Sequence, residues 1–382
     1  MLKTVKDFNF KGKRVIIRCD FNVPLKRGKV LDDFKIKRSL KTINHLKKQG
    51  AQIVILSHLG RPKRKKKSCS LRSIGLKLSE LLNSKVVFRA KCCGKRAQKA
   101  AQQLKKGEVL LLENLRFEKG EEANDKEFVQ ELKKLGSSYV GEAFSVSHRN
   151  HASVVSLPRV MPHCIGFDFE EELKFLSQLN QNPKKPYAVI IGGSKVESKM
   201  PAVKRFLKKA DHVLLGGQIA NVILSLKGIC IGRHIFNGRI KEVTSGFSLT
   251  DPRMHLPFDV VAVSGEVIRE AGPASVRKEE DILDIGAETR EAFSDIIKES
   301  KTIFWSGVLG KVEEEKFSLG TEKVMQAIVD NKRALKVAGG GDTIAFIRKH
   351  SKEQSFSFLS TGGSAALAFL AGQKLPGIEA LK

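Results

Sequence analysis

Short apolar runs alternate with longer amphipathic segments along most of this 382-residue chain. The apolar runs predict β-strands at 14–21, 51–59, 107–115, 187–193, 211–217, 258–264, 301–307 and 335–341. Helical patterns lie between them, for example at 70–83 and 125–136. Such alternation is typical of a parallel sheet covered by helices on both faces, so we expect an α/β fold. Right-handed crossovers would bring the loops after the strands to one edge of the sheet, where open α/β sheets bind ligands.

The length of the chain predicts two domains, because 382 residues exceed what one hydrophobic core usually organises. The strand ends also differ between the two halves. Before about residue 150 they carry Arg, His, Asp and Asn, and after about residue 190 they carry glycine-rich turns with Lys, Asp and Thr. Different loop chemistry suggests two different ligands. The segment 168–181 predicts a linking helix that ends before NPKKP.

The charge balance indicates either an anionic partner or a lysine-rich surface with no specific partner. The chain has 69 Lys and Arg against 41 Asp and Glu, a net charge of +28, which attracts nucleic acid, anionic lipid or phosphorylated metabolites. The run RPKRKKKS at 61–68 is either a solvated loop or a basic patch that faces phosphate. There is no zinc-finger spacing and no RNP-like aromatic motif, which argues against nucleic acid.

Neither a membrane nor a secretory signal is indicated. No apolar stretch approaches the roughly 18 residues of a membrane helix, and no apolar block follows the first charges of the chain. The six cysteines are scattered, without a CxxC motif, and we expect reduced thiols. These features predict a cytoplasmic protein without a membrane partner.

Three glycine-rich turns in the second half predict a polyphosphate site. They read GGSKVESK from 192, GGGDT from 339 and TGGSA from 361. Glycine lets backbone N–H groups approach a phosphate closely, and the start of a helix adds unpaired donors. Any one of these turns alone would be read as an ordinary connection between a strand and a helix. Asp342 is the natural magnesium ligand there, or an N-cap, and the two roles are compatible.

Strand ends in the first half predict a site for a small anion with several charges. Their polar residues are Asp20, Asn22, His58, Arg61, Arg116, His148, Arg149 and His151. Arginine suits phosphate and carboxylate because its planar fork donates two parallel hydrogen bonds. The pair His148 and His151 is alternatively a metal pair, although no third ligand at a suitable spacing stands out.

These strand ends, taken in order, resemble phosphoglycerate kinase. The resemblance runs through RVIIRCDFNVP, SHLGRP, LLLENLRF, SHRNHAS, GGSKVESK, DIGAET, FWSGVLG, GGGDT and STGGSAAL to LPGIEAL. It implies a monomer of two Rossmann-like domains with parallel sheets flanked by helices, joined by a hinge helix whose bending closes the enzyme. The implied reaction is phosphoryl transfer from 1,3-bisphosphoglycerate to MgADP, which gives ATP and 3-phosphoglycerate in glycolysis.

The resemblance also implies domain bounds and residue roles. The N-terminal domain would span 1–167 and the nucleotide domain 182–372, with a tail at 373–382 packed back on the N-terminal domain. Phosphoglycerate would be bound by Asp20, Phe21, Asn22, Lys35, His58, Leu59, Gly60, Arg61, Arg116 and Arg149. Nucleotide would be bound by Lys195, Lys199, Glu313, Gly340, Gly341, Asp342 and Thr343, with Mg²⁺ on Asp342. The catalytic set would be Lys35, Lys199, Gly362 and Gly363.

Some positions depart from the family pattern. Lys35 stands where the family carries an arginine, so one charge is kept and a two-point contact is lost. Either Lys35 works alone, or Arg38 partly substitutes for the missing arginine. Near the nucleotide, Ser306 and Val308 replace Asn and Pro, and Ser198 stands where many members have Asp. Two alternatives stay open on these grounds: a family member with weakened catalysis, and a basic protein that binds nucleic acid or anionic surfaces.

Overall fold

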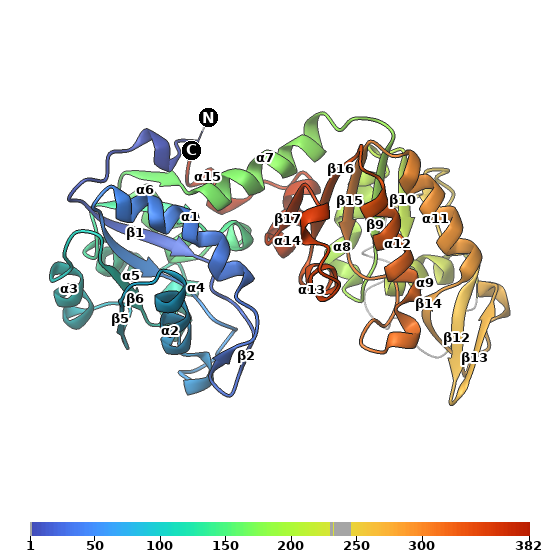
Figure 1. Ribbon diagram of the computed structural model, residues 1–382, viewed down its shortest axis with the longest axis horizontal. Coiled ribbons are helices and arrows are strands. Elements are labelled where there is room, and N and C mark those ends of the chain that lie inside the picture. Colours follow the sequence, from blue (N-terminus) through green and yellow to red (C-terminus); the bar gives the residue numbers. More distant parts are fainter. Residues whose placement is uncertain (1, 230–231, 233–245) are drawn as a thin grey trace. The chain divides into compact units, whose positions relative to one another are not determined.

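The computed structural model describes residues 2–229, 232 and 246–382. It divides into two compact units, and Figure 1 shows a sheet with flanking helices in each. Residues 1–174 and 374–382 form the N-terminal unit, and residues 175–373 form the C-terminal unit. The predicted α/β class is confirmed, since each unit has its own six-stranded parallel sheet. Helix α7 spans Phe167–Gln181, whereas the predicted domain bounds and the linking role of this helix stay predictions.

The sheet of the N-terminal unit is parallel throughout, in the order β5-β6-β4-β1-β7-β8. Its strands are β1 (Arg14–Cys19), β4 (Gln52–Leu56), β5 (Val86–Arg89), β6 (Val109–Leu112), β7 (Ser138–Glu142) and β8 (His163–Ile165). The central strands are near-continuous apolar runs because both of their faces are covered. A short hairpin, β2 (Leu25–Lys26) and β3 (Lys29–Val30), follows β1.

Helices of the N-terminal unit cover this sheet with their apolar faces. They are α1 (Phe34–Lys48), α2 (Arg72–Leu81), α3 (Lys95–Gln102), α4 (Lys119–Glu122), α5 (Lys126–Lys133) and α6 (Leu157–Arg159). In α1, for example, Ile36, Ile43 and Leu46 are fully buried in the main core. The C-terminal segment belongs to the same unit. Within α15 (Pro376–Glu379), the Gly377 N–H donates a hydrogen bond to the Ser147 carbonyl (2.8 Å). Ala380, just after this helix, packs in a small apolar cluster.

The C-terminal unit repeats the architecture with a second parallel sheet, ordered β11-β10-β9-β15-β16-β17. Its strands are β9 (Tyr187–Ile191), β10 (His212–Leu215), β11 (Met254–His255), β15 (Thr302–Ser306), β16 (Leu335–Gly339) and β17 (Phe358–Ser360). Its helices include α8 (Val196–Phe206), α9 (Gly217–Leu226), α11 (Ala287–Glu299), α12 (Leu319–Asp330), α13 (Gly341–Lys349) and α14 (Gly363–Leu370). Pro201 lies inside α8.

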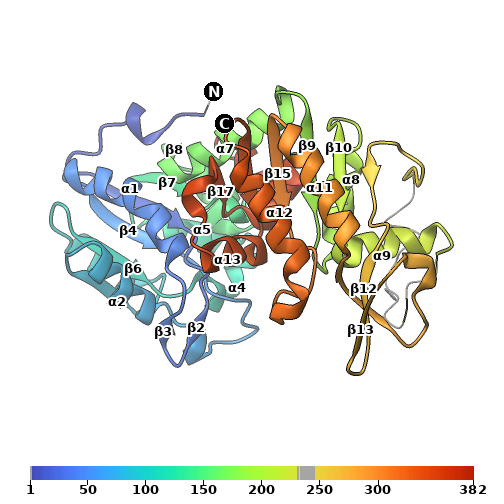
Figure 2. The same ribbon diagram turned by 45° about the vertical axis from the view of Figure 1, so that its right-hand side comes forward.

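One predicted strand is not part of a parallel sheet. Residues 258–264 contain β12 (Val260–Ser264), which pairs antiparallel with β13 (Val267–Ala271) and β14 (Asp281–Ile285). A two-residue turn with Gly265 at φ +59° joins β12 to β13, whereas a parallel crossover needs a dozen residues or more. Figure 2 shows β12 and β13 as a ribbon in this unit. The other seven predicted strands lie in the two parallel sheets.

None of the helices in the described part of the chain is long and apolar enough to cross a membrane.

Candidate functional site

The sheet of the N-terminal unit has a switch in strand order at β1. The chain goes from β1 to β4 and β6 on one side, whereas β7 and β8 lie on the other. A crevice forms at such a switch outside the carboxyl ends of the strands. The loops that leave β1, β4 and β6 there carry the sequence-predicted residues Asp20, His58 and Arg116.

Asp20 is a nearly buried carboxylate with three hydrogen-bond donors. Its Oδ2 accepts from Lys35 Nζ (2.6 Å) and from Ser145 Oγ (2.5 Å), and its Oδ1 accepts from the Asn22 N–H (3.0 Å). Burial disfavours the charge, but the ammonium of Lys35 and the hydrogen bonds to the carboxylate hold the pKa of Asp20 well below its usual value. Asp20 therefore carries a negative charge that positions Lys35.

The structure separates the roles of Lys35 and Arg38, which both lie in the first turns of α1. Whereas Lys35 contacts Asp20, Arg38 donates from Nε to Asp168 Oδ1 (2.5 Å). A second nitrogen of Arg38, Nη2, lies 3.4 Å from Glu171 Oε2. Both of these carboxylates are on α7. This geometry favours the interpretation in which Lys35 works alone over the one in which Arg38 substitutes.

His58 lies beside a buried arginine that the sequence analysis did not predict. Arg18 is 1% exposed and donates to Ser153 Oγ (2.8 Å) and to the Cys19 carbonyl (2.7 Å). Its Nη2 lies 3.4 Å from His58 Nδ1. Burial and the field of Arg18 lower the pKa of His58 well below its usual value, so the imidazole is neutral. The one available signal for Arg18 was a charge inside the apolar run of β1.

Asn22, Gly60 and Arg116 are joined by hydrogen bonds through the backbone of Gly60. The Gly60 N–H donates to Asn22 Oδ1 (2.8 Å), and Arg116 Nη1 donates to the Gly60 carbonyl (2.6 Å). Burial lowers the pKa of Arg116, and Arg61 is exposed. The loops after β1, β4 and β6 thus form one surface.

Phe21 and Leu59 have side chains in the core, at 0% and 5% exposure. They can offer only backbone groups to a ligand at this edge.

The two histidines of HRNH are uncharged at neutral pH. Burial first, and then nearby arginines, lower the pKa of His148 and of His151 to about 4. His151 Nδ1 lies 3.9 Å from the buried carboxylate of Glu121. In the part of the chain that the structure describes, neither histidine belongs to a group of three close metal-ligating side chains. Arg149, which lies between them in the sequence, is half-buried.

The corresponding switch of the C-terminal sheet lies between β9 and β15. The turns after these strands are joined by hydrogen bonds from the Gly192 N–H to the Ser306 carbonyl (3.1 Å) and from the Gly193 N–H to the Val308 carbonyl (2.7 Å). A Cβ at Gly192 would lie 2.2 Å from the Val308 carbonyl oxygen. Glycine is therefore required for the two turns to approach each other. Because Ser306 and Val308 contribute backbone carbonyls, their departure from the family pattern leaves these bonds intact.

Lys199 is held between the same two turns. Its Nζ donates to the carbonyls of Gly192 (2.6 Å) and Ser306 (3.1 Å). A Cβ at Gly307, which has φ +103°, would lie 2.3 Å from that nitrogen. Burial lowers the pKa of Lys199 to about 8, while the carboxylate of Asp342 opposes this shift. Lys195, in contrast, is exposed at the N-cap of α8.

The start of α13 carries the predicted GGGDT turn. Gly340 is its N-cap with φ +96°, and both Gly341 and Asp342 are exposed in its first turn. Thr343 is fully buried, and its Oγ1 accepts a hydrogen bond from the Gly307 N–H (2.6 Å). The Thr343 hydroxyl thus joins this turn to the one after β15.

Gly362 and Gly363 begin a third helix at the same edge of the sheet. Gly362 is the N-cap of α14, and Gly363 is its first residue with φ +52°. The preceding strand β17 pairs with β16, whose end leads to α13. Two helix N-termini with unpaired amides therefore follow neighbouring strands.

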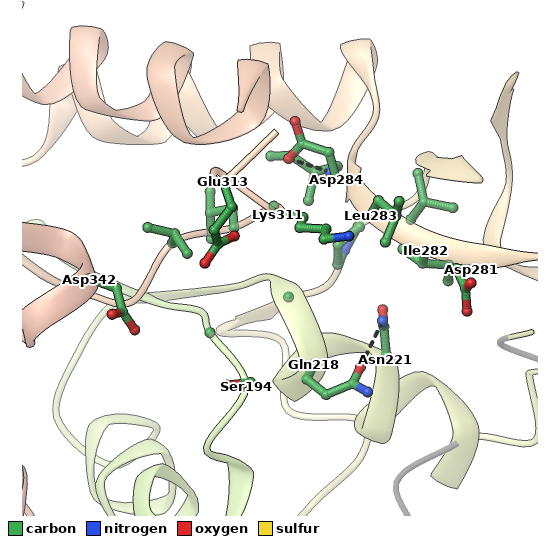
Figure 3. Close-up of a pocket in the computed structure, with 18 residues that line it drawn as sticks. Ser194, Gln218, Asn221, Asp281, Ile282, Leu283, Asp284, Lys311, Glu313 and Asp342 are labelled. Carbon is green, nitrogen blue, oxygen red and sulfur yellow. Dashed lines mark hydrogen bonds between the residues drawn. The ribbon is translucent and has the colours of Figure 1, made fainter. Parts of the chain in front are cut away.

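A pocket with a volume of about 440 Å³ opens beside these turns. In Figure 3, Asp342 and Glu313 lie toward one end of the pocket and Asp281 toward the other. Gln218 and Asn221 line it from α9, where the Asn221 amide donates to Gln218 Oε1 (3.1 Å). Its volume suits a nucleoside-sized group.

The sequence analysis found Glu313 and Asp342 but missed most of the lining. Gln218 and Asn221 lie on a helix, and Ile282, Leu283 and Asp284 lie on β14 of the small antiparallel sheet. Asp284 is buried and accepts from the N–H groups of Gly320 (2.7 Å) and Ile285 (2.9 Å), and burial raises its pKa to about 6. None of the motifs quoted above includes Gln218, Asn221, Ile282 or Leu283, whereas Asp284 begins DIGAET.

Comparisons with known proteins agree with this geometry. A family model for phosphoglycerate kinase matches residues 5–373. The phosphoglycerate kinase of Borrelia garinii subsp. bavariensis is 41% identical over 392 residues, covering 100% of this chain and 99% of the relative. The phosphoglycerate kinase of Orientia tsutsugamushi is 41% identical over 393 residues, covering 100% and 97%.

Two solved structures are also similar. Phosphoglycerate kinase from Coxiella burnetii has a TM-score of 0.86 at 33% identity and covers 100% of this chain and 99% of its own. The enzyme from Pyrococcus horikoshii has a TM-score of 0.89 at 33% identity and covers 100% and 98%. Sequence and structure thus match over the whole chain and over both units. The chain belongs to the phosphoglycerate kinase family of glycolytic phosphotransferases.

Proposed function

We propose that this chain catalyses the reversible transfer of a phosphoryl group from 1,3-bisphosphoglycerate to MgADP, giving 3-phosphoglycerate and ATP. The N-terminal unit binds the phosphoglycerate, and the C-terminal unit binds the nucleotide. The observation that carries the proposal is the Lys199 ammonium, bonded to the Gly192 carbonyl (2.6 Å) at the switch between β9 and β15. A phosphoryl acceptor bound there meets a positive charge and two helix N-termini.

The nucleotide occupies the pocket beside these turns. Glu313 accepts hydrogen bonds from the ribose hydroxyls, and the amides at the start of α13 face the phosphates. Lys195, exposed at the N-cap of α8, adds a charge to the phosphate-binding surface.

Asp342 fits a magnesium ion, since it is an exposed carboxylate in the first turn of α13 and lines the pocket with Glu313. Mg²⁺ prefers a few carboxylate oxygens together with phosphates and water. When bound, the ion neutralises phosphate charge. This family uses a magnesium nucleotide, and Asp342 is the ligand we propose for it.

The phosphoglycerate is bound at the switch of the N-terminal sheet. Arg61, Arg116 and Arg149 supply guanidinium groups for its charged ends, while Asp20 and Asn22 accept from hydroxyl groups. His58 donates as a neutral imidazole. Lys35, held 2.6 Å from Asp20 Oδ2, contacts the reacting carboxyl-phosphate. Like other members of the family, the protein is expected to work as a monomer.

No strong general base is needed for this reaction. Neither the acyl phosphate nor the ADP oxygen must lose a proton before transfer, so catalysis depends on positioning and on neutralisation of charge. The neutral histidines and the protonated lysines of the two sites agree with this requirement. Gly362 and Gly363 direct backbone N–H groups of α14 at the group being transferred, and Lys199 stabilises its charge.

A coupled assay of ATP formation tests the proposed function. We expect turnover with 1,3-bisphosphoglycerate, ADP and magnesium, and loss of turnover when the metal is chelated. Asp342→Asn should raise the magnesium concentration needed for half-maximal rate, because one carboxylate ligand is lost. Nucleotide binding without ATP formation would identify a catalytically weakened member of the family instead.

The two lysines should differ in their effects. Lys199→Ala is expected to lower kcat by about 10² to 10³, the usual loss when one group that stabilises transition-state charge is removed. Nucleotide KM should change less. Lys195→Ala should raise nucleotide KM as well, since its exposed ammonium contacts phosphates in ground and transition states alike. Steady-state kinetics with thermal melts as a folding control would check this, and equal profiles for the two variants would contradict it.

The pH profile should reveal the buried lysine. Burial lowers the pKa of Lys199 to about 8, so its charge is present below that pH and is lost as the pH rises through it. We expect kcat/KM for the nucleotide to fall above about pH 8, and kcat to fall at a higher pH because bound phosphate stabilises the ammonium. The Lys195→Ala variant should show the same fall in kcat/KM at high pH. A profile that stays flat to about pH 10, where ordinary lysines titrate, would exclude the assignment.

Restoring the family arginine should improve turnover. Lys35→Arg is expected to raise kcat about tenfold, since one recovered charge-assisted hydrogen bond contributes about 1.5 kcal/mol. Arg38→Ala should change kcat by less than about twofold, which corresponds to much less free energy than that one hydrogen bond contributes. The reason is that Arg38 already bonds Asp168 and Glu171. Lys35→Ala is the matched reference. A loss in Arg38→Ala as large as in Lys35→Ala would show that Arg38 does substitute.

A further inference from the structure

Two adjacent cysteines and a glutamate form a cluster that takes no part in the two sites described above. Cys92 and Cys93 lie between β5 and α3, and Glu118 follows a 3₁₀ turn at Leu115–Phe117. The two sulfurs and one carboxylate oxygen of Glu118 all lie within 4.8 Å of one another. In the part of the chain that the structure describes, this is the one group of three such side chains close enough to share a metal ion.

The three side chains are available to a ligand. Both thiols are free rather than oxidised to a disulfide. Glu118 is the N-cap residue of α4, yet its carboxylate makes no capping hydrogen bond, and no ion pair engages it within the described residues. Cys92 is 1% exposed, whereas Cys93 and Glu118 are half-buried and open to solvent. A cation could therefore reach the cluster from one side.

The electrostatics of the pair favour a thiolate at Cys93. A hydrogen bond from Cys92 lowers the pKa of Cys93, and the same bond, together with burial, raises the pKa of Cys92. The thiolate is the form of cysteine that binds metals. Both sulfurs bind a metal as thiolates, so metal binding should release protons and tighten as the pH rises.

We propose that Cys92, Cys93 and Glu118 bind a thiophilic divalent cation such as Zn²⁺, with water completing a tetrahedron. Zinc lies about 2.3 Å from thiolate sulfur and about 2.0–2.2 Å from carboxylate oxygen. Tetrahedral ligands at those bond lengths are separated by about 3.5–3.8 Å, so three atoms already within 4.8 Å of one another need only small side-chain rotations. Thiolates select zinc or cadmium over magnesium, which keeps this site distinct from the one proposed at Asp342.

The site is tested on the full chain with Cd²⁺ as a spectroscopic probe. The protein is kept reduced with a phosphine reductant, and ultraviolet absorption from thiolate-to-cadmium charge transfer is followed during titration. This signal reports sulfur ligands alone, so binding at Asp342 does not contribute. We expect saturation at one equivalent, together with a rise in Tm with Zn²⁺, since a ligand of the folded state stabilises it by mass action.

Three variants identify the ligands. Cys93→Ser should abolish the stoichiometric signal and the Tm shift, while leaving unchanged the magnesium-dependent kinase activity measured without added zinc or cadmium. Glu118→Gln should weaken binding by at least about tenfold, the lower end of the loss found when supporting groups of zinc sites are removed. Cys69→Ser is the matched control, because it removes a half-exposed thiol outside the cluster and should bind cadmium like the unaltered chain.

Several outcomes would overturn the proposal. An unchanged signal in Cys93→Ser would place binding elsewhere, for example at Cys230, which lies outside the described residues. Binding that survives Glu118→Gln at full affinity would reject the three-ligand site. A chain that binds no cadmium when fully reduced, and in which mass spectrometry finds Cys92 joined to Cys93 after air oxidation, would make the pair a redox element rather than a metal site.

Discussion

The close approach of the turns after β9 and β15 is the constraint on which the C-terminal unit depends. A side chain at Gly192 or Gly307 would collide with the opposite turn or with the Lys199 ammonium, at 2.2 Å and 2.3 Å. The carbonyls that converge on Lys199 would repel one another without a cation between them. The lysine therefore has a structural role beside the catalytic one proposed for it, and its partial burial follows from the structural role.

The turn after β15 is also hydrogen-bonded to the turn that follows the neighbouring strand β16. The Gly307 N–H donates a hydrogen bond to the Thr343 hydroxyl at the start of α13, so the helix proposed to face the phosphates is positioned from β15. This chain of contacts runs through backbone groups and buried hydroxyls rather than through exposed side chains. It explains why side-chain departures at Ser306 and Val308 are compatible with the fold, since only their carbonyls are used.

The N-terminal unit has a different constraint, because it must stabilise closely spaced positive side chains before an anion binds. Arg18 is compensated by neutral acceptors, the Ser153 hydroxyl and the Cys19 carbonyl. Ser153 is in turn held by the fully buried carboxylate of Glu121 (2.6 Å). The neighbouring histidines, His58 and His151, are neutral because burial and the nearby arginines lower their pKa values. A ligand with several negative charges therefore adds attraction without having to displace a buried ion pair at Arg18.

Sequence predicted what depends on strand ends, and missed what depends on packing. Seven strands, Lys199 and the glycine turns follow from local pattern because parallel strands deliver their loops to one edge. The strand at 258–264 was placed in the wrong kind of sheet, since the Gly265 turn decides the pairing and not the apolar run. Gln218 and Asn221 were not predicted, because the sequence does not distinguish a polar helix residue that lines a pocket from one that faces solvent. The hydrogen bond between the Thr343 hydroxyl and the Gly307 N–H was not predicted, since the two residues are 36 positions apart in the sequence.

The replacement of an arginine by Lys35 is better understood from its contact with Asp20 than from its charge. An ammonium has three donors, so Lys35 can keep Asp20 Oδ2 at 2.6 Å and still donate to a ligand. What it cannot do is hold two ligand oxygens in one plane. Attraction of the substrate should then be nearly unchanged, and the deficit should fall on orientation in the transition state. Arg38 cannot repair that deficit without leaving Asp168, which would uncover a buried carboxylate next to Glu142, whose own pKa is raised to about 8 mainly by burial. The cost of that exchange keeps Lys35 and Arg38 in separate roles.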